Sequence, residues 1–324
     1  MSNSFDSHSD ASGQKLLRYS SVGVFLCTLL VYVLLAQLSM HLYNPVTNSG
    51  TFWPGAGLSL ALLLMLPSRQ WIWVIAAIGI SEFAGNQIYD RPLAANFFWT
   101  CANCLEPLIG ATLIRRSGNR NGAIAPQSNM FRFLAYAVVV APFIGASIGS
   151  IGTFYLVDTP FLSSWPKWFI GDSLGVLVVA PVLLLRIKLG NPFLWPREHI
   201  VFAVLLFITG TLILRNWSSF LDLVLPYLFL PFALWSALRF GLRGTALTTL
   251  FIATAASLSM SFGYVPFHAD ALPEIHGVTM MQVRLHIVSC TALVVAVLTH
   301  DLIQGLSNEK RLLRQAHRDE LTGL

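Results

Sequence analysis

The stretch Thr291-Ala-Leu-Val-Val-Ala-Val-Leu298 is apolar, and the chain continues from it into the charged run Glu309-Lys-Arg311. An apolar helix that leaves a membrane and continues as an amphipathic helix can carry a change in the bilayer to whatever follows it. The sequence given ends shortly afterwards, in Asp319-Glu-Leu-Thr-Gly-Leu324. We therefore expect residues 304–318 to form a signalling helix after the last membrane span.

The composition of the whole chain is that of a multi-pass membrane protein. Of its residues 55% are hydrophobic and only 11% are charged, whereas roughly a quarter are charged in soluble domains. Residues 1–19 are polar and lack the small-residue cleavage site of a removable signal peptide. We expect an all-α bundle of transmembrane helices over residues 20–303, preceded by a cytoplasmic tail over residues 1–19.

The apolar runs give the expected spans. A helix needs roughly 20 mostly apolar residues to cross a hydrocarbon core about 30 Å thick. Runs of this kind lie at 20–43, 52–66, 70–89, 93–114, 131–157, 165–186, 199–214, 222–240, 244–263 and 280–303. The second run is short enough to be re-entrant or tucked against its neighbour.

The positive charges predict how the chain is oriented. With the N-terminus inside, only Arg91, Lys167, Arg215 and Arg284 of the 20 Lys and Arg residues fall in outer segments. Because cytoplasmic loops retain positive charge, both termini are expected in the cytoplasm. The net charge of +5 then belongs to residues facing anionic lipid headgroups, which makes the bilayer the expected partner and excludes nucleic acid.

Three carboxyl groups, those of Glu82, Glu106 and Asp172, fall within apolar runs. Each costs on the order of 2.5–3.5 kcal/mol at the centre of a span, so they should face the bundle interior. Asn86 follows Glu82 by four residues and Asn103 precedes Glu106 by three, so each pair shares a helical face. Either these groups hold the helices together, or they line a ligand pocket or a proton- or redox-sensitive site.

Other polar or small residues within the runs suggest further contacts. Gly171 and Gly175 stand four apart around Asp172 and predict a close approach by another helix. Arg239, at the end of the eighth run, can pair with one of the intramembrane carboxylates if its depth permits. The depth of that helix is not fixed by the sequence.

Cysteine and histidine spacing raises two narrower hypotheses. Cys101 and Cys104 have the spacing of a redox motif, although they lie in an apolar helix. His286 and His300 lie nearly on one face of the last span, where a haem between helices is conceivable. We expect no disulfide framework and no metal site, because the cysteines lack partners at ligand spacing.

Several motifs resemble, in chain order, those of the first type of MASE domain, a family of membrane-associated sensors. They are Trp53-Pro-Gly-Ala-Gly57, Asn103 with Glu106, Trp168-x-x-Gly171-Asp172-x-x-Gly175 with Pro181, and Trp235-x-x-x-Arg239-Phe-Gly241. The resemblance implies a sensor of the bacterial inner membrane placed before a GGDEF, EAL or histidine-kinase output domain. The family is usually drawn with about eight spans, so about eight to ten are expected here. The candidate sensing residues are Trp53, Glu82, Asn86, Asn103, Glu106, Asp172, Trp235 and Arg239.

The terminal hexapeptide resembles the opening of a GGDEF domain, the module of diguanylate cyclases, whose first turn reads Asp-x-Leu-Thr-Gly-Leu. The matching residues are Asp319, Leu321, Thr322, Gly323 and Leu324. The resemblance implies a truncated cyclase domain over 319–324, with GTP as substrate and Mg²⁺ as its ion. Residues 1–324 themselves are expected to hold no cofactor and no catalytic residue. A homodimer through residues 302–316 is also implied, because two GTP molecules must meet in facing active sites.

The resulting hypothesis is a sensory domain that detects an unknown stimulus and regulates a C-terminal diguanylate cyclase making cyclic di-GMP. The alternative from another class is a membrane transporter or solute-binding bundle whose terminal hexapeptide is coincidental. A third is the sensor of a histidine kinase or another output domain. The codons that follow Leu324 discriminate between these hypotheses.

Overall fold

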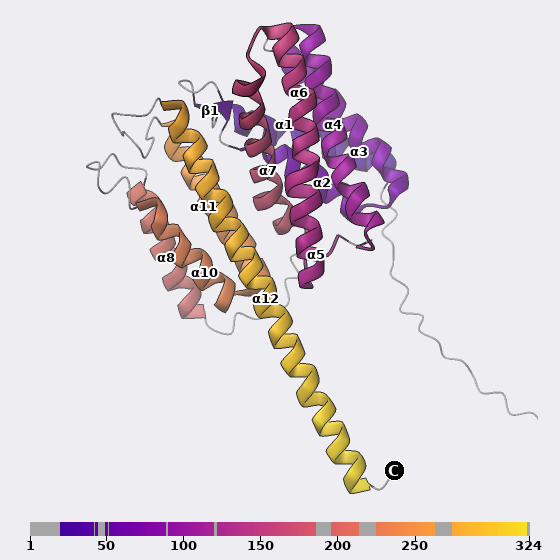
Figure 1. Ribbon diagram of the computed structural model, residues 1–324, viewed down its shortest axis with the longest axis vertical. Helices are drawn as coiled ribbons and strands as arrows, with labels where there is room; N and C mark the ends of the chain where they lie inside the picture. Colours follow the sequence, from indigo (N-terminus) through magenta and orange to yellow (C-terminus); the bar gives the residue numbers. More distant parts are fainter. Residues whose placement is uncertain are drawn as a thin grey trace, which may run out of the picture.

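A computed structural model describes residues 20–41, 43–44, 49–50, 52–88, 90–119, 122–185, 196–213, 225–262 and 274–322. Every apolar run named above contains a helix there, and the helices form one bundle (Figure 1). The predicted all-α, polytopic fold is thereby confirmed. Residues 1–19 lie outside the described ranges, so the cytoplasmic tail stays a prediction.

The elements follow the apolar runs in order. The first part of the bundle consists of α1 (Ser21–His41), α2 (Pro54–Met65), the 3-10 turn η1 (Ser68–Gln70), α3 (Trp71–Ile88), α4 (Leu93–Arg116), α5 (Gln127–Arg132), the π-helical segment η2 (Phe133–Val140), α6 (Ala141–Val157) and α7 (Phe161–Leu184). The second part consists of α8 (Pro196–Ile213), η3 (Leu225–Leu228), α10 (Phe229–Arg239), α11 (Gly241–Ser261) and α12 (Glu274–Thr322). Two short strands, β1 (Tyr43–Asn44) and β2 (Ser49–Gly50), pair antiparallel after α1.

Six helices in the described ranges are long and apolar enough to cross a membrane. They are Ser21–Met40, Leu93–Arg116, Gln127–Val157, Phe161–Leu184, Gly241–Ser261 and Thr279–Gln315. The other runs are helical too, but they are shorter or more polar. The 12-residue helix α2 is the clearest case, because it is too short to span and nearly all of its residues are buried, as expected for a run tucked against its neighbours.

Helix α7 lies between the two parts of the bundle. Its residue Leu177 packs in an apolar core shared with α1 to α4, whereas Leu174 and Val178 pack in a second core shared with α8, α10, α11 and α12. The most apolar window of α7 is 61% buried, but that of α1 is only 17% buried. Helix α7 therefore packs against both parts of the bundle.

The helices α2 and α7 approach so closely that only glycine fits between them. A Cβ atom on Gly175 would overlap with the carbonyl group of Trp53, and one on Gly57 would overlap with the carbonyl oxygen of Gly175. The backbone N–H of Trp53 donates to the carbonyl oxygen of Gly171 at 3.0 Å. The close approach predicted from the glycine spacing is confirmed, and Gly175 is the residue that permits it.

Helix α12 is the longest element, with 49 residues, and it extends past the bundle at the end where α5 lies (Figure 1). Its first part packs against α7, α10 and α11, and residues 302–315 are exposed. The turn expected at Asp319 is wrong for the described residues, because the helix continues through Thr322. Glu320 and Leu321 favour helix. Gly323 and Leu324 lie outside the described ranges.

Candidate functional site

A polar cavity of about 380 Å³ opens among α1, α3, α4, α6 and α7. The turns that border it, before α4 and between α6 and α7, lie at the opposite end of the bundle from the extension of α12 (Figure 1). Its chemically distinctive lining residues are the carboxylates Glu82 and Asp172, the amides Asn86 and Asn103, the cations Arg91 and Lys167, and the aromatic residues Phe52, Trp53, Trp99 and Trp168. Five of the eight candidate residues from the sequence thus line one cavity.

The Glu82 carboxylate is held in place by donors from three helices. Tyr32 on α1 donates its hydroxyl to Glu82 Oε1 at 2.6 Å, and Asn86 on α3 donates to Oε2 at 3.5 Å. Asn103 on α4 also hydrogen-bonds to this carboxylate. Trp53 Nε1 donates in turn to the Tyr32 hydroxyl at 3.4 Å. Because an ionised carboxylate only accepts hydrogen bonds, these donors suit a negatively charged Glu82.

A second carboxyl group lies deeper and shares a hydrogen bond with a third. Asp172 on α7 lines the cavity, and its carboxyl group is hydrogen-bonded to that of Glu106 on α4, which lies behind it. Two carboxyl groups can hydrogen-bond only through a proton, so the pair carries one negative charge at most. Gly145 on α6 leaves the room for Glu106, since a Cβ atom there would press on its carboxyl group.

Two cations stand where the cavity opens. Arg91 is exposed and Lys167 is partly buried, whereas Glu82 is 8% and Asp172 is 6% exposed. The backbone of Arg91 is tied to α3, since its N–H donates to the Asn86 carbonyl oxygen at 3.2 Å. Arg91 and Lys167 are two of the four Lys and Arg residues expected in outer segments. The cavity is therefore negative at its floor and positive at its mouth.

Tryptophan side chains form much of the wall. Trp99 Nε1 donates to Thr153 Oγ1 at 3.0 Å, which joins α4 to α6. Trp168 packs so closely on α6 that a Cβ atom on Gly149 would overlap with its ring. Trp53 is fixed through its backbone bond to α7. These contacts leave large aromatic surfaces along the cavity.

Trp235 and Arg239, two of the candidate sensing residues, do not line this cavity. Trp235 Nε1 donates to Glu198 Oε1 at 3.1 Å, and Arg239 forms a bidentate ion pair with Glu198 at 2.8 Å. An intramembrane carboxylate was the expected partner of Arg239. Because Arg239 lies at the end of α10, it instead contacts Glu198 in the first turn of α8. The hydrogen bonds from Arg239, and then that from Trp235, lower the pKa of Glu198 to about 2.

The narrower cysteine and histidine hypotheses have no support in the geometry. Cys101 and Cys104 are free thiols, and no cluster in the described residues could hold a metal ion. Both ring nitrogens of His286 are hydrogen-bonded, to Ser173 Oγ at 2.9 Å and to the Gln282 carbonyl oxygen at 2.8 Å. His286 is therefore a contact between α12 and α7 and not a haem ligand.

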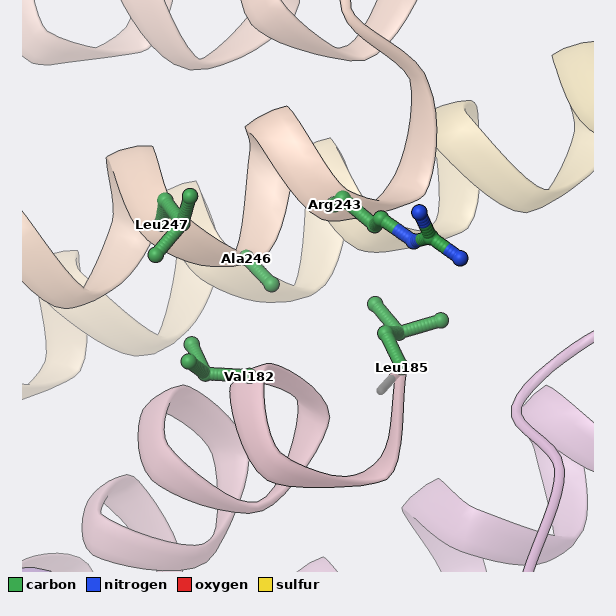
Figure 2. Close-up of a pocket in the computed structure, with 5 residues that line it drawn as sticks. All are labelled: Val182, Leu185, Arg243, Ala246 and Leu247. Carbon is green, nitrogen blue, oxygen red and sulfur yellow. The ribbon is translucent and has the colours of Figure 1, made fainter. Parts of the chain in front are cut away.

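A smaller hollow lies near the other end of α7, where α11 begins (Figure 2). Val182 of α7 and Leu185, the residue after α7, face Ala246 and Leu247 of α11 across it, and Arg243 lies at one side (Figure 2). Its volume is about 20 Å³, which is room for about one water molecule. This hollow is too small for an organic ligand.

Sequence reasoning missed several residues of the cavity. Trp99, which lines the cavity, and Tyr32, which donates to Glu82, lie in apolar helices, and nothing in their spacing distinguishes them from residues that face lipid. Arg91 and Lys167 did carry a signal, because they depart from the rule that keeps positive charge inside. Cations that remain on the outer side despite that rule are candidates for a functional role.

The fold and the cavity together define the class of protein: a membrane domain with several transmembrane helices, a polar pocket, and a long helix, α12, that extends beyond the bundle. The MASE1 family matches residues 23–301, and the chain belongs to this family of membrane-associated sensor domains. It is a multi-pass protein of the bacterial inner membrane. The chain is similar to the probable diguanylate cyclase DgcE of Escherichia coli (strain K12), with 24% identity over 241 residues. That match covers 72% of this chain but only 21% of the relative's length. No solved structure matches the chain.

Proposed function

We propose that the chain is the membrane sensory domain of a diguanylate cyclase. A stimulus acts in the polar pocket, and helix α12 passes the resulting change to a cyclase domain that makes cyclic di-GMP from GTP with Mg²⁺. The similarity to a probable diguanylate cyclase and the terminal hexapeptide Asp319-Glu-Leu-Thr-Gly-Leu324 support this output. The cyclase domain itself would follow Leu324.

One observation carries the proposal. Asp172 lines the pocket, and the next residue, Ser173, is hydrogen-bonded to His286 of α12 at 2.9 Å. Helix α12 then continues without a break to Thr322. A shift of α7 at the pocket therefore acts directly on the helix that leaves the membrane, and a rigid helix transmits displacement along its length.

A second contact joins α12 to the bundle at the opposite end. The backbone N–H of Gln127, the first residue of α5, donates to Asp301 Oδ2 of α12 at 2.7 Å. Helix α5 continues through η2 into α6, the helix that contributes Thr153 to the pocket. Helix α7 thus contacts α12 directly, and α6 is connected to it through η2 and α5.

The proposed output unit is a homodimer through the exposed part of α12. Leu302, Leu306 and Leu313 are 50–63% exposed in the single chain and follow heptad steps, with Glu309 between them. A second copy of the same helix would cover this apolar seam. Pairing would also bring two cyclase domains together, as the synthesis of cyclic di-GMP from two GTP molecules requires.

The test begins with the reading frame beyond Leu324. It should encode Asn-Arg and then a Gly-Gly-Asp/Glu-Glu-Phe loop, and membranes holding the full-length protein should convert GTP to cyclic di-GMP when Mg²⁺ is present. A matched variant with the second glycine of that loop replaced should be inactive. A stop codon, or a kinase domain in the same place, would refute the cyclase proposal.

A further inference from the structure

The floor of the pocket contains a buried polar atom that lacks a partner. Asp172 is 6% exposed, and its Oδ2 atom has no hydrogen-bond partner within the described part of the chain. The Asp172 carboxyl group also contacts that of Glu106, whose Oε1 atom likewise has no hydrogen-bond partner among the described residues. A buried acceptor without a donor costs about 1–3 kcal/mol. Because Asp172 lines a cavity, rotation of its carboxyl group toward the cavity would bring this atom within reach of a donor from a bound molecule.

The surroundings of Asp172 favour a positively charged donor. Trp53, Trp99 and Trp168 line the same cavity, and the faces of aromatic rings attract ammonium groups. Glu82, whose oxygens already accept bonds from Tyr32 and Asn86, adds negative charge near the floor. An ammonium group there would be attracted by both the carboxylates and the rings.

The mouth of the cavity favours a negatively charged group. Arg91 and Lys167 line the cavity on its exposed side and attract a carboxylate or phosphate. Glu82 and the hydrogen-bonded pair of Asp172 with Glu106 carry at most two negative charges, no more than the two cations balance. A ligand with one charge of each sign keeps this balance, whereas a simple anion or cation disturbs it.

We propose that the pocket binds a small zwitterion, with its ammonium group against Asp172 and its anionic group near Arg91 and Lys167. This inference rests on the sensory function proposed above and assigns the chemical class of its stimulus. The cavity volume of about 380 Å³ lies at the lower end of the range for small-molecule sites, about 300–1,000 Å³. Free α-amino acids and the ethanolamine headgroup of a phospholipid share the required chemistry, whereas a betaine has both charges but no N–H donor.

The experiment compares three matched forms of each probe with the purified chain. The probes are α-amino acids, their methyl esters, which lack the carboxylate, and their N-acetyl derivatives, which lack the ammonium group; glycine betaine and phosphoethanolamine complete the set. Quenching of tryptophan fluorescence and the shift in Tm report binding, because a ligand stabilises the folded state by mass action. At least one zwitterion should bind about tenfold more tightly than either single-charge form, a difference of about 1.4 kcal/mol.

Substitutions in the pocket test which residue binds each charged end of the ligand. Asp172→Asn should weaken binding of the zwitterion and of the ester, and Arg91→Gln should weaken binding of the zwitterion and of the N-acetyl form. Arg132→Gln, at the other end of the bundle, is the control and should change neither. Arg91 is exposed, so this variant tests the inference even if Asp172→Asn does not fold.

Nanodiscs separate the two sources of the zwitterion. If the ligand is the headgroup of phosphatidylethanolamine, adding this lipid to phosphatidylglycerol nanodiscs should raise the Tm of the protein and weaken the binding of free probes. If the ligand is a solute, adding the lipid should change neither the Tm nor the binding of the probes. The inference is overturned if no zwitterion and no phosphatidylethanolamine changes Tm, or if single-charge forms bind as tightly. Cyclase activity is measured separately, so a failed ligand assignment leaves the sensory proposal open to its own test.

Discussion

Ser173 Oγ lies 2.9 Å from His286 Nε2, and this hydrogen bond joins α7 to α12 beside the pocket. The other ring nitrogen, Nδ1, lies 2.8 Å from the Gln282 carbonyl oxygen. Because a carbonyl oxygen only accepts, Nδ1 carries the proton in the neutral ring, and Nε2 accepts from the Ser173 hydroxyl. The position and tautomer of His286 are thus fixed from both sides.

Replacing Ser173 by alanine should weaken this junction. The variant loses a hydrogen bond between two membrane helices, which is worth about 0.6–1.7 kcal/mol. The free energy of unfolding in mixed micelles with increasing dodecyl sulfate measures the loss. Ser257→Ala is the control, because that buried hydroxyl donates within its own helix, to the Ala253 carbonyl oxygen, and should cost less. Equal losses for the two variants would show that the contact between α7 and α12 adds no stability.

A methyl group at Gly175 should separate α2 from α7. The added Cβ atom would overlap with the Trp53 carbonyl group, and backbone cannot move aside as a flexible side chain can. Overpacking of this kind costs about 1–3 kcal/mol, so Gly175→Ala should lower Tm and weaken the bond from Trp53 to Gly171. The control Gly85→Ala has open space at its Cβ position and should stabilise α3 slightly, by up to about 1 kcal/mol. A Gly175→Ala protein as stable as the parent would contradict the packing described.

The contact between Asp301 and the start of α5 predicts a difference between two substitutions. Asp301→Ala removes the acceptor of the Gln127 N–H, and losing a helix cap costs about 0.5–2 kcal/mol. Asp301→Asn keeps a side-chain oxygen that can accept from the Gln127 N–H, so it should retain most of the stabilisation of α5. Hydrogen exchange of the amides at 127–132 should therefore be faster in the alanine variant than in the asparagine variant. Unchanged exchange in both would mean that Asp301 does not hold α5.

The ion pair between Glu198 and Arg239 should make stability depend on acidic pH. Glu198 has a pKa of about 2 in the folded protein against an ordinary value of 4.5, so its contribution is fully present above about pH 4.5. The contribution should disappear as the pH falls toward 2, because the unfolded chain binds the proton first. Tm measured between pH 5 and pH 2.5 should fall less steeply for Glu198→Gln than for the parent. Parallel curves would rule out the ion pair as a source of pH dependence.

Paired α12 helices should give a periodic pattern of crosslinks. In a background without Cys27, Cys101, Cys104 and Cys290, single cysteines at Leu302, Leu306 and Leu313 should form disulfide dimers in native membranes. Cysteines at Gln304, Asn308 and Arg311 lie on the opposite face and serve as controls. Uniform or absent crosslinking would contradict a paired helix.

Much of the fold could be predicted because the bilayer sets a length scale. Apolar length alone was enough to locate a helix in each predicted run, although some boundaries differ. For example, α7 begins at Phe161 after Pro160, a few residues before its predicted start, because proline suits the residues before the first helical turn. The position of α2 inside the bundle agrees with its short predicted run. Helix α12 begins at Glu274, earlier than expected. Its first residues include polar side chains, so a search for apolar runs did not include them.

The candidate site was only partly predictable, because a sequence does not say which helices are neighbours. The shared face of Glu82 and Asn86 follows from helical spacing, and their side chains do meet. Asn103 and Glu106 were expected to face one neighbour, but Asn103 contacts Glu82 and Glu106 contacts Asp172. Those pairings depend on how α4 packs against α3 and α7, which is a tertiary property.

The central claim is that a change in the pocket reaches α12 through the bond between Ser173 and His286. The most direct measurement is the rate of cyclic di-GMP synthesis by the full-length protein carrying Arg91→Gln, Ser173→Ala or both. Arg91→Gln should change the rate in the parent background, and the fold-change should shrink toward one when Ser173 is already alanine. The claim is contradicted if Arg91→Gln has no effect, or if it changes the rate by the same factor in both backgrounds.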